Sequence, residues 1–224
     1  MLWKEWKAKQ NWEPFDRYRV RLRLKHIVGG LPAVPEIIKT WVETRNADKT
    51  AEEQKLMINA HIDELPEVAD EVAEKKTIVF PRVGGQLAIE GRQVKAMLKE
   101  AANVVKNSLP RGCGKDGKIA ALKSKVAETV FVEEEYISLG RAEPDEVIER
   151  PISVVTRQGP RTSIKRCEVC RDVEIEFHLR RLRGGEVSEA VLLAILEYAQ
   201  QMGLGADRSQ GRGVFEVVDV EKQS

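Results

Sequence analysis

Four glycines and two arginines stand close together near the end of the chain, in Gly203–Phe215 (Gly-Leu-Gly-Ala-Asp-Arg-Ser-Gln-Gly-Arg-Gly-Val-Phe). Glycine lets a backbone turn its N–H groups toward an anion, or lets another chain approach closely. The guanidinium groups of Arg208 and Arg212 are suited to hold phosphate through paired N–H donors. The pattern therefore favours a phosphate-binding loop. The alternative is a flexible connector.

This loop lies between a predicted helix and a predicted strand. The amphipathic run Ser188–Met202 precedes it, and the apolar run Val214–Val220 follows it. Gly203 is expected to end the helix, because left-handed backbone is most accessible to glycine. The loop is therefore expected to be held at both ends by regular structure.

A helix, a Gly-x-Gly-x-x-Arg-Ser-x-Gly-x-Gly loop and a final apolar strand resemble the C-terminal signature of the RAMP superfamily. Its members are RNA-binding proteins of CRISPR effector complexes. The resemblance directly covers the last quarter of the chain. It implies an α+β chain with a modified ferredoxin-like (RRM-like) fold, inserted loops and a projecting β-hairpin. It also implies a single domain over residues 1–224.

The clearest strand is predicted at Arg17–Val28, where apolar and cationic residues alternate. The cationic positions are Arg17, Arg19, Arg21, Arg23 and Lys25. Charges of one sign repel each other unless something anionic offsets them. We therefore read Arg19, Arg21 and Arg23 as a surface for nucleic acid or an acidic partner. Neutralisation by acidic residues of the same chain is the alternative.

The remaining elements follow from periodicity and turn residues. A hairpin is expected over 77–89 around Gly84-Gly85, and a helix over 91–106. Strands are expected over 126–139, 152–156 and 172–183. Two further segments are predicted: an acidic helical insertion at 46–76 and a basic hairpin at 150–171.

The resemblance assigns RNA contacts to two of these elements. In backbone-forming RAMP proteins a helix with basic residues lies beside the RNA, and the segment from Ile89 to Lys99, with Arg92 and Lys95, looks like it. A basic hairpin resembles the thumb that such subunits lay across RNA, which implicates Arg157 and Arg161. The full expected RNA-binding set is Arg19, Arg21, Arg23, Arg92, Lys95, Arg157, Arg161, Gly203, Gly205, Arg208, Ser209, Gly211, Arg212 and Gly213.

A second basic concentration lies between residues 92 and 125, where nine lysines and arginines face only Glu100 and Asp116. Within it, Lys106–Lys118 is glycine-bearing, and we expect a flexible loop. Mobile cations of this kind suit a polyanion, because they neutralise phosphates and release counterions. The alternative is a solvated loop tip.

Catalytic and metal sites are less well supported. His26 lies near the end of the first strand, where RNA-processing members of the same superfamily use a histidine as base, but strand parity turns it toward the core. Cys167 and Cys170 form a C-x-x-C pair, with Cys113 distant, whereas structural zinc usually needs four ligands from two such pairs. We expect no metal and no cofactor.

Composition bounds the remaining possibilities. The chain has 224 residues and a net charge of +1, so its charge distribution has to indicate any nucleic acid. No apolar run is long enough for a membrane span, and three cysteines fit a reducing compartment. A cytoplasmic address is expected.

We therefore expect an RNA-binding backbone-type subunit, similar to CRISPR effector RAMP proteins. It would bind guide-like single-stranded RNA by its phosphates and assemble along it, as a homo-oligomer or in a multi-subunit effector complex. One alternative is a metal-independent endoribonuclease of the same superfamily with His26 as general base. The other is a protein–protein scaffold without nucleic acid.

Overall fold

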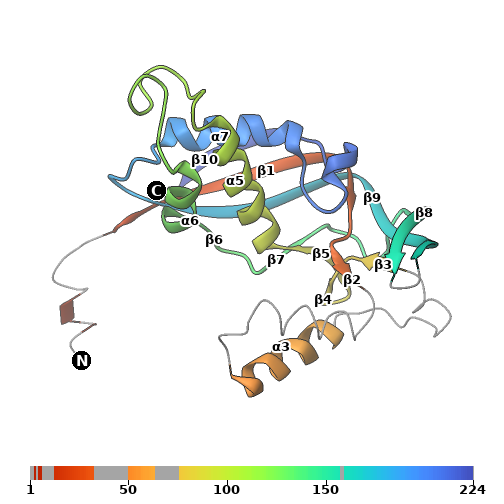
Figure 1. Ribbon diagram of the computed structural model, residues 1–224. Coiled ribbons are helices and arrows are strands. Elements are labelled where there is room, and N and C mark those ends of the chain that lie inside the picture. Colours follow the sequence, from red (N-terminus) through yellow and green to blue (C-terminus); the bar gives the residue numbers. More distant parts are fainter. Residues whose placement is uncertain are drawn as a thin grey trace.

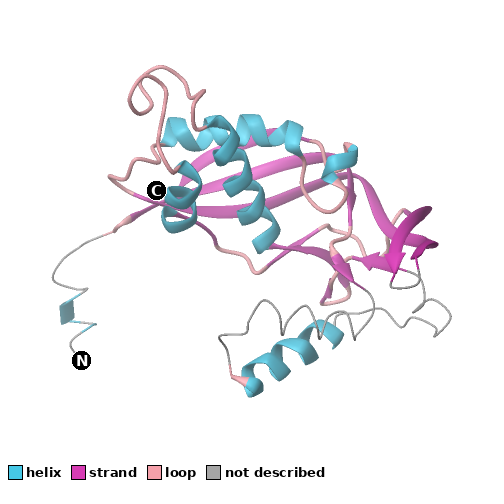
Figure 2. Ribbon diagram, viewed as in Figure 1, coloured by secondary structure: helices cyan, strands magenta, loops and turns pink. Residues whose placement is uncertain are grey.

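A computed structural model describes Trp3, Glu5, Trp6 and residues 13–32, 50–63, 76–156 and 159–223. Its centre is an antiparallel sheet in the order β10–β1–β9–β6. These strands are β1 (Phe15–Val28), β6 (Val130–Val132), β9 (Gly159–Leu182) and β10 (Phe215–Gln223). Two helices, α5 (Gly91–Val105) and α7 (Glu189–Met202), cover the same face of this sheet (Figure 2).

Chain order and sheet order together identify the topology. Along the chain the core elements run β1, α5, β6, β9, α7, β10, which is the β-α-β-β-α-β pattern. In space the first strand lies between the last strand and the third, and the second strand is at the edge. This is the ferredoxin-like arrangement. The predicted α+β, modified ferredoxin-like fold is confirmed.

The core follows from the periodicity of β1 and α5. Tyr18, Val20, Leu22 and Leu24 are buried, while the arginines between them face away from the helices. On α5, which lies within the helix predicted over 91–106, the buried stripe includes Val94, Leu98, Ala101 and Val105. One buried cluster joins these positions to α7 and β9. The opposite face of the sheet is therefore the polar one.

Additional elements modify the fold. They are β2 (Leu31–Pro32), α3 (Ala51–Asp63), β3 (Lys76–Val79), β4 (Arg82–Val83), β5 (Gln86–Glu90), α6 (Leu122–Thr129), β7 (Tyr136–Ser138) and β8 (Glu146–Thr156). The Gly84-Gly85 turn joins β4 to β5, as predicted. The strand prediction over 126–139 is wrong at its start, since residues 126–129 are helical in α6.

The basic hairpin is formed by β8 and the first half of β9, paired from Glu146↔Val169 to Thr156↔Gly159. It projects from the end of the sheet that lies farthest from β6 (Figure 1). The tip residues 157–158 lie outside the described part, as do residues 46–49 and 64–75 of the predicted acidic insertion, which contains α3. No described helix is long and apolar enough to cross a membrane.

Candidate nucleic-acid interface

The glycine loop, residues 203–214, connects α7 to β10 and lies against the end of β1. Ser188 caps α7, accepting from the N–H of Val191, and the helix ends at Gly203, whose φ is +79°. The N–H of Ala206 donates to the carbonyl of Val28 at 3.2 Å. The loop therefore meets the central strand at the end where β1 enters Gly29-Gly30.

Three of the loop glycines pack against the protein's own backbone. A Cβ added at Gly213 would lie 1.9 Å from the carbonyl oxygen of Leu204, and one at Gly203 would lie 2.5 Å from that of Arg212. At Gly205 it would lie 2.8 Å from the carbonyl of Val28. The close approach predicted for these glycines is thus made by this chain itself. Gly211 differs, because its φ is +75° but no atom lies within 4 Å of an added Cβ.

Asp207 anchors the loop to the basic hairpin. Its backbone is left-handed, with φ +56°, and its carboxylate side chain is only 10% exposed. The carboxylate pairs with Arg150 of β8 and, at 2.5 Å, with Lys165 of β9. Sequence reasoning missed this role, although Asp207 is the only acidic residue in the loop and Arg150 and Lys165 needed a counterion.

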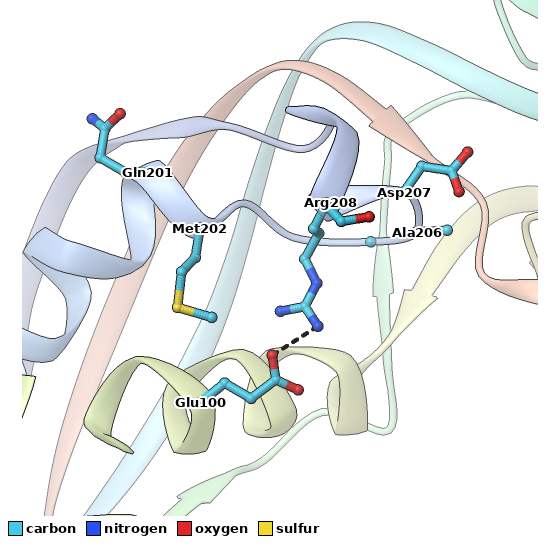
Figure 3. A pocket seen from close by; sticks show the side chains of 8 residues that line it. Glu100, Gln201, Met202, Ala206, Asp207 and Arg208 are labelled. Atoms are coloured by element: carbon cyan, nitrogen blue, oxygen red, sulfur yellow. Dashed lines mark ion pairs between the residues drawn. The ribbon is translucent and has the colours of Figure 1, made fainter. Parts of the chain in front are cut away.

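Arg208 reaches in the other direction, toward α5. Its guanidinium lies 2.8 Å from the carboxylate of Glu100, while Asp207 points away from this pair (Figure 3). An open hollow of about 650 Å³ lies between the loop and α5. Its lining is Glu100, Gln201, Met202, Gly205, Ala206, Asp207, Arg208 and Ser209.

Donors gather at this hollow. The short helix η1 (Arg208–Gln210) begins there, and no main-chain carbonyl of the described residues accepts from the N–H of Asp207, Arg208 or Ser209. The hydroxyl-bearing Ser209 is exposed. Arg212 is half-buried and forms no ion pair with any residue that the structure describes. On the loop side the hollow is therefore lined by residues with side-chain donors, Arg208 and Ser209, and Arg212 belongs to the same loop but not to this lining.

The arginines of β1 are already neutralised. Arg19 lies 2.5 Å from Glu221, and Arg21 lies 3.4 Å from Asp219, both on β10. Arg23 lies 2.7 Å from Glu174 of β9. Rows of acidic residues on both neighbouring strands thus flank the cationic row. The fold thus provides the intramolecular neutralisation that the sequence left as the alternative for this face.

Lys95 and Arg92 also have intramolecular partners. The Lys95 ammonium donates to the carbonyls of Val126 at 3.0 Å and Ala127 at 2.8 Å, and so caps the C-terminal end of α6. Burial, with a smaller contribution from the charge of Lys99, lowers the pKa of Lys95 to about 8. Arg92 pairs with Glu90. Arg157 lies outside the described residues, and the side chain of Arg161 does too.

The geometry of the described residues does not support a catalytic role for His26 or a metal site at the cysteines. His26 is partly buried, and its Nε2 is enclosed without a hydrogen-bond partner in the described structure. Cys113, Cys167 and Cys170 are buried free thiols, and burial raises the pKa of Cys170 to about 11. Among the described residues no three histidine, cysteine or acidic side chains gather as metal ligands would.

No known protein family and no curated protein matches this sequence. Among the solved structures that match, one chain belongs to a structure described as "Cryo-EM structure of the Type III-B Cmr-beta bound to cognate target RNA". The similarity has a TM-score of 0.42 at 12% identity, and covers 99% of this chain but 65% of that one. Similarity at this level does not establish function.

Proposed function

We propose that this chain is an RNA-binding, RAMP-like domain spanning residues 1–224, which holds the phosphate backbone of single-stranded RNA at the glycine loop. The observation that carries the proposal is the donor-lined hollow between the loop and α5. The N–H groups of residues 207–209 donate to no main-chain carbonyl of the described residues, and together with the guanidinium groups of Arg208 and Arg212 in the same loop they suit an anion. A phosphate oxygen would accept from several of these donors at once.

The loop is suited to this role because its own contacts fix its shape. The glycine contacts to Leu204 and Val28 hold the backbone, and the Asp207 carboxylate ties it to the hairpin base. A donor set that is already ordered loses less conformational entropy when a ligand binds. The Arg208–Glu100 pair involves a single exposed carboxylate, with which a phosphate can compete, whereas the arginine row of β1 is flanked by acidic residues on both neighbouring strands.

The proposal places further contacts at the hairpin tip, through Arg157 and Arg161. It no longer uses Arg19, Arg21 and Arg23, whose charges are offset on the sheet, nor Lys95, whose ammonium is occupied by carbonyls. Assembly along the RNA with other copies, or within a multi-subunit effector complex, belongs to the same proposal. The endoribonuclease alternative is set aside, because the Nε2 of His26 is enclosed.

A salt titration tests the proposal. Affinity for a fluorescein-labelled, single-stranded RNA of mixed sequence is measured by anisotropy between 50 and 200 mM salt. Binding through about five phosphates predicts a slope of log K against log salt near −3.5, since each contact to a single strand contributes about −0.7. A scrambled sequence should bind equally well. No binding, or binding that is independent of salt, would refute the proposal.

A further inference from the structure

The loop that joins α5 to α6, here called the basic loop (residues 106–121), carries cations that the proposed site does not use. We propose that this loop is a second contact for the phosphate backbone of the same RNA, which would run from the glycine loop along α5. This inference rests on the proposed function and extends it. It assigns the basic loop a ligand class, single-stranded nucleic acid, and a place in the RNA path.

The charges of the basic loop lack counterions. Arg111, Lys115 and Lys118, together with Lys123 just beyond it, are exposed, and none forms an ion pair with any described residue. The arginines of β1 and the cations Arg150 and Lys165 of the hairpin base, by contrast, have carboxylate partners. The basic loop is therefore a place where positive charge remains available to an external anion.

The basic loop also contains a hydrogen-bonded turn. Lys115 and Lys118 exchange both main-chain hydrogen bonds, at 3.1 and 3.0 Å, across an Asp116-Gly117 turn. The φ angles of the two turn residues are +54° and +73°, as a tight type I′ turn requires. This turn places the two lysines directly opposite each other, as a cross-strand pair.

Buried anchors hold this turn to the body. Leu109, Cys113 and Ile119 are at most 7% exposed, and all three belong to the main hydrophobic cluster. The N–H of Ile119 donates to the carbonyl of Lys106 at the end of α5, at 3.0 Å. Two lysines fixed side by side repel each other, so an anion between them would relieve this repulsion.

The composition of the basic loop favours nucleic acid over a protein partner. Apart from Asp116 in the turn, its exposed positions are cationic, small or uncharged polar, including Asn107, Ser108 and Gly112, and no large apolar side chain is exposed among them. Tight protein interfaces need buried aromatic or aliphatic anchors. Phosphate contacts need only cations, polar side chains and backbone N–H groups. The basic loop offers the second set.

Helix α5 connects the two contacts. Arg208 of the glycine loop pairs with Glu100 of α5, and the basic loop begins at Lys106, where the same helix ends. These two positions are about 9 Å apart along the helix axis, at about 1.5 Å per residue. The basic loop curls above the helix layer, on the side away from the sheet (Figure 1). A strand of a few nucleotides along α5 would meet both.

The test compares two RNA lengths on three proteins. A labelled RNA dinucleotide and a single-stranded RNA of about 20 nucleotides are titrated by anisotropy. The dinucleotide is too short to reach both contacts, whereas the longer RNA covers a site of this type, which spans about 4–16 nucleotides. The proteins are the wild type, Lys115→Ala/Lys118→Ala, and Arg19→Ala/Arg23→Ala, which removes the same charge from the neutralised face. The basic-loop variant should bind the longer RNA about tenfold more weakly, with a salt slope shallower by about 1.4. It should bind the shorter RNA as the wild type does.

The other possible results distinguish failure of this inference from failure of the proposed function. Unchanged binding of the longer RNA by the basic-loop variant, with a wild type that does bind, overturns this inference alone. Equal weakening for both lengths overturns the path along α5. A variant that binds RNA normally but loses poly-L-glutamate assigns the basic loop to an acidic protein instead. A wild type that binds neither RNA refutes the proposed function itself. Melting temperatures of all three proteins check that they are folded.

Discussion

Replacing Gly213 with alanine tests the conclusion that the glycine loop is held by its own backbone. The residue has φ +78°, and an added Cβ would lie 1.9 Å from the Leu204 carbonyl oxygen. The same backbone pair is joined by a hydrogen bond from the N–H of Leu204 to the carbonyl of Gly213, at 2.8 Å. The new methyl group must therefore push this pair apart.

The expected loss of stability follows from three contributions. Left-handed backbone costs an alanine about 1 kcal/mol. Loss of the hydrogen bond adds about 1 kcal/mol, and forced displacement of packed backbone adds about 2 kcal/mol. Gly213→Ala should therefore lower the free energy of unfolding by about 4 kcal/mol. Gly211→Ala is the matched control: its φ is also positive, but space is open, so only the conformational cost of about 1 kcal/mol applies.

Thermal and urea unfolding of both variants measure the difference. In a chain of this size about 1 kcal/mol corresponds to roughly 2–4 °C in Tm. We therefore expect a fall of about 12 °C for Gly213→Ala and about 3 °C for Gly211→Ala. Equal and small losses in the two variants would refute the account of the loop as a backbone-packed structure, and would restore the flexible connector.

Two further predictions concern buried carboxylates. Asp207→Asn keeps a residue that tolerates left-handed backbone but leaves Arg150 and Lys165 without their anion. The free energy of unfolding, measured with urea, should therefore fall by about 2 kcal/mol. An unchanged urea midpoint would contradict the role of Asp207 as an anchor of the loop. Burial acts to raise the pKa of Asp16, but hydrogen bonds from Arg183 and Lys222 and the charges of Lys222 and Arg181 outweigh it, so this pKa is lowered. The resulting stability is present above about pH 4 and lost as pH falls further. The deficit of Asp16→Asn should therefore shrink from pH 7 to pH 3, and a constant deficit would be the contrary result.

Local patterns were enough to predict the elements that carry the fold. The alternation in β1, the apolar stripe of α5 and the helix before Gly203 all reflect burial on one face, which a sequence records directly. The strand prediction at Val126–Thr129 failed because β-branched residues there form the end of α6, where Lys95 caps the last carbonyls. Tertiary contacts override such weak local preferences.

The partners of the charged residues could not be predicted. Arg19 and Arg21 meet Glu221 and Asp219 only because β10 returns beside β1 in one particular register. A shift by one residue would have left the arginines unpaired. The loop glycines pose the same difficulty. A glycine indicates that another backbone passes close to it, but the sequence does not say whether that backbone belongs to this chain or to a ligand. Gly203, Gly205 and Gly213 meet this chain, which only the fold reveals.

The central claim is that the glycine loop binds RNA phosphate, and Arg208→Ala and Arg212→Ala test it most directly. The measurement is the affinity of each variant for labelled single-stranded RNA across a salt titration, with Arg23→Ala as the control for loss of one charge. We predict that each loop variant binds more weakly, with a salt slope reduced by about 0.7, while its melting temperature stays near that of the wild type. Affinities equal to the wild type in both loop variants would contradict the claim.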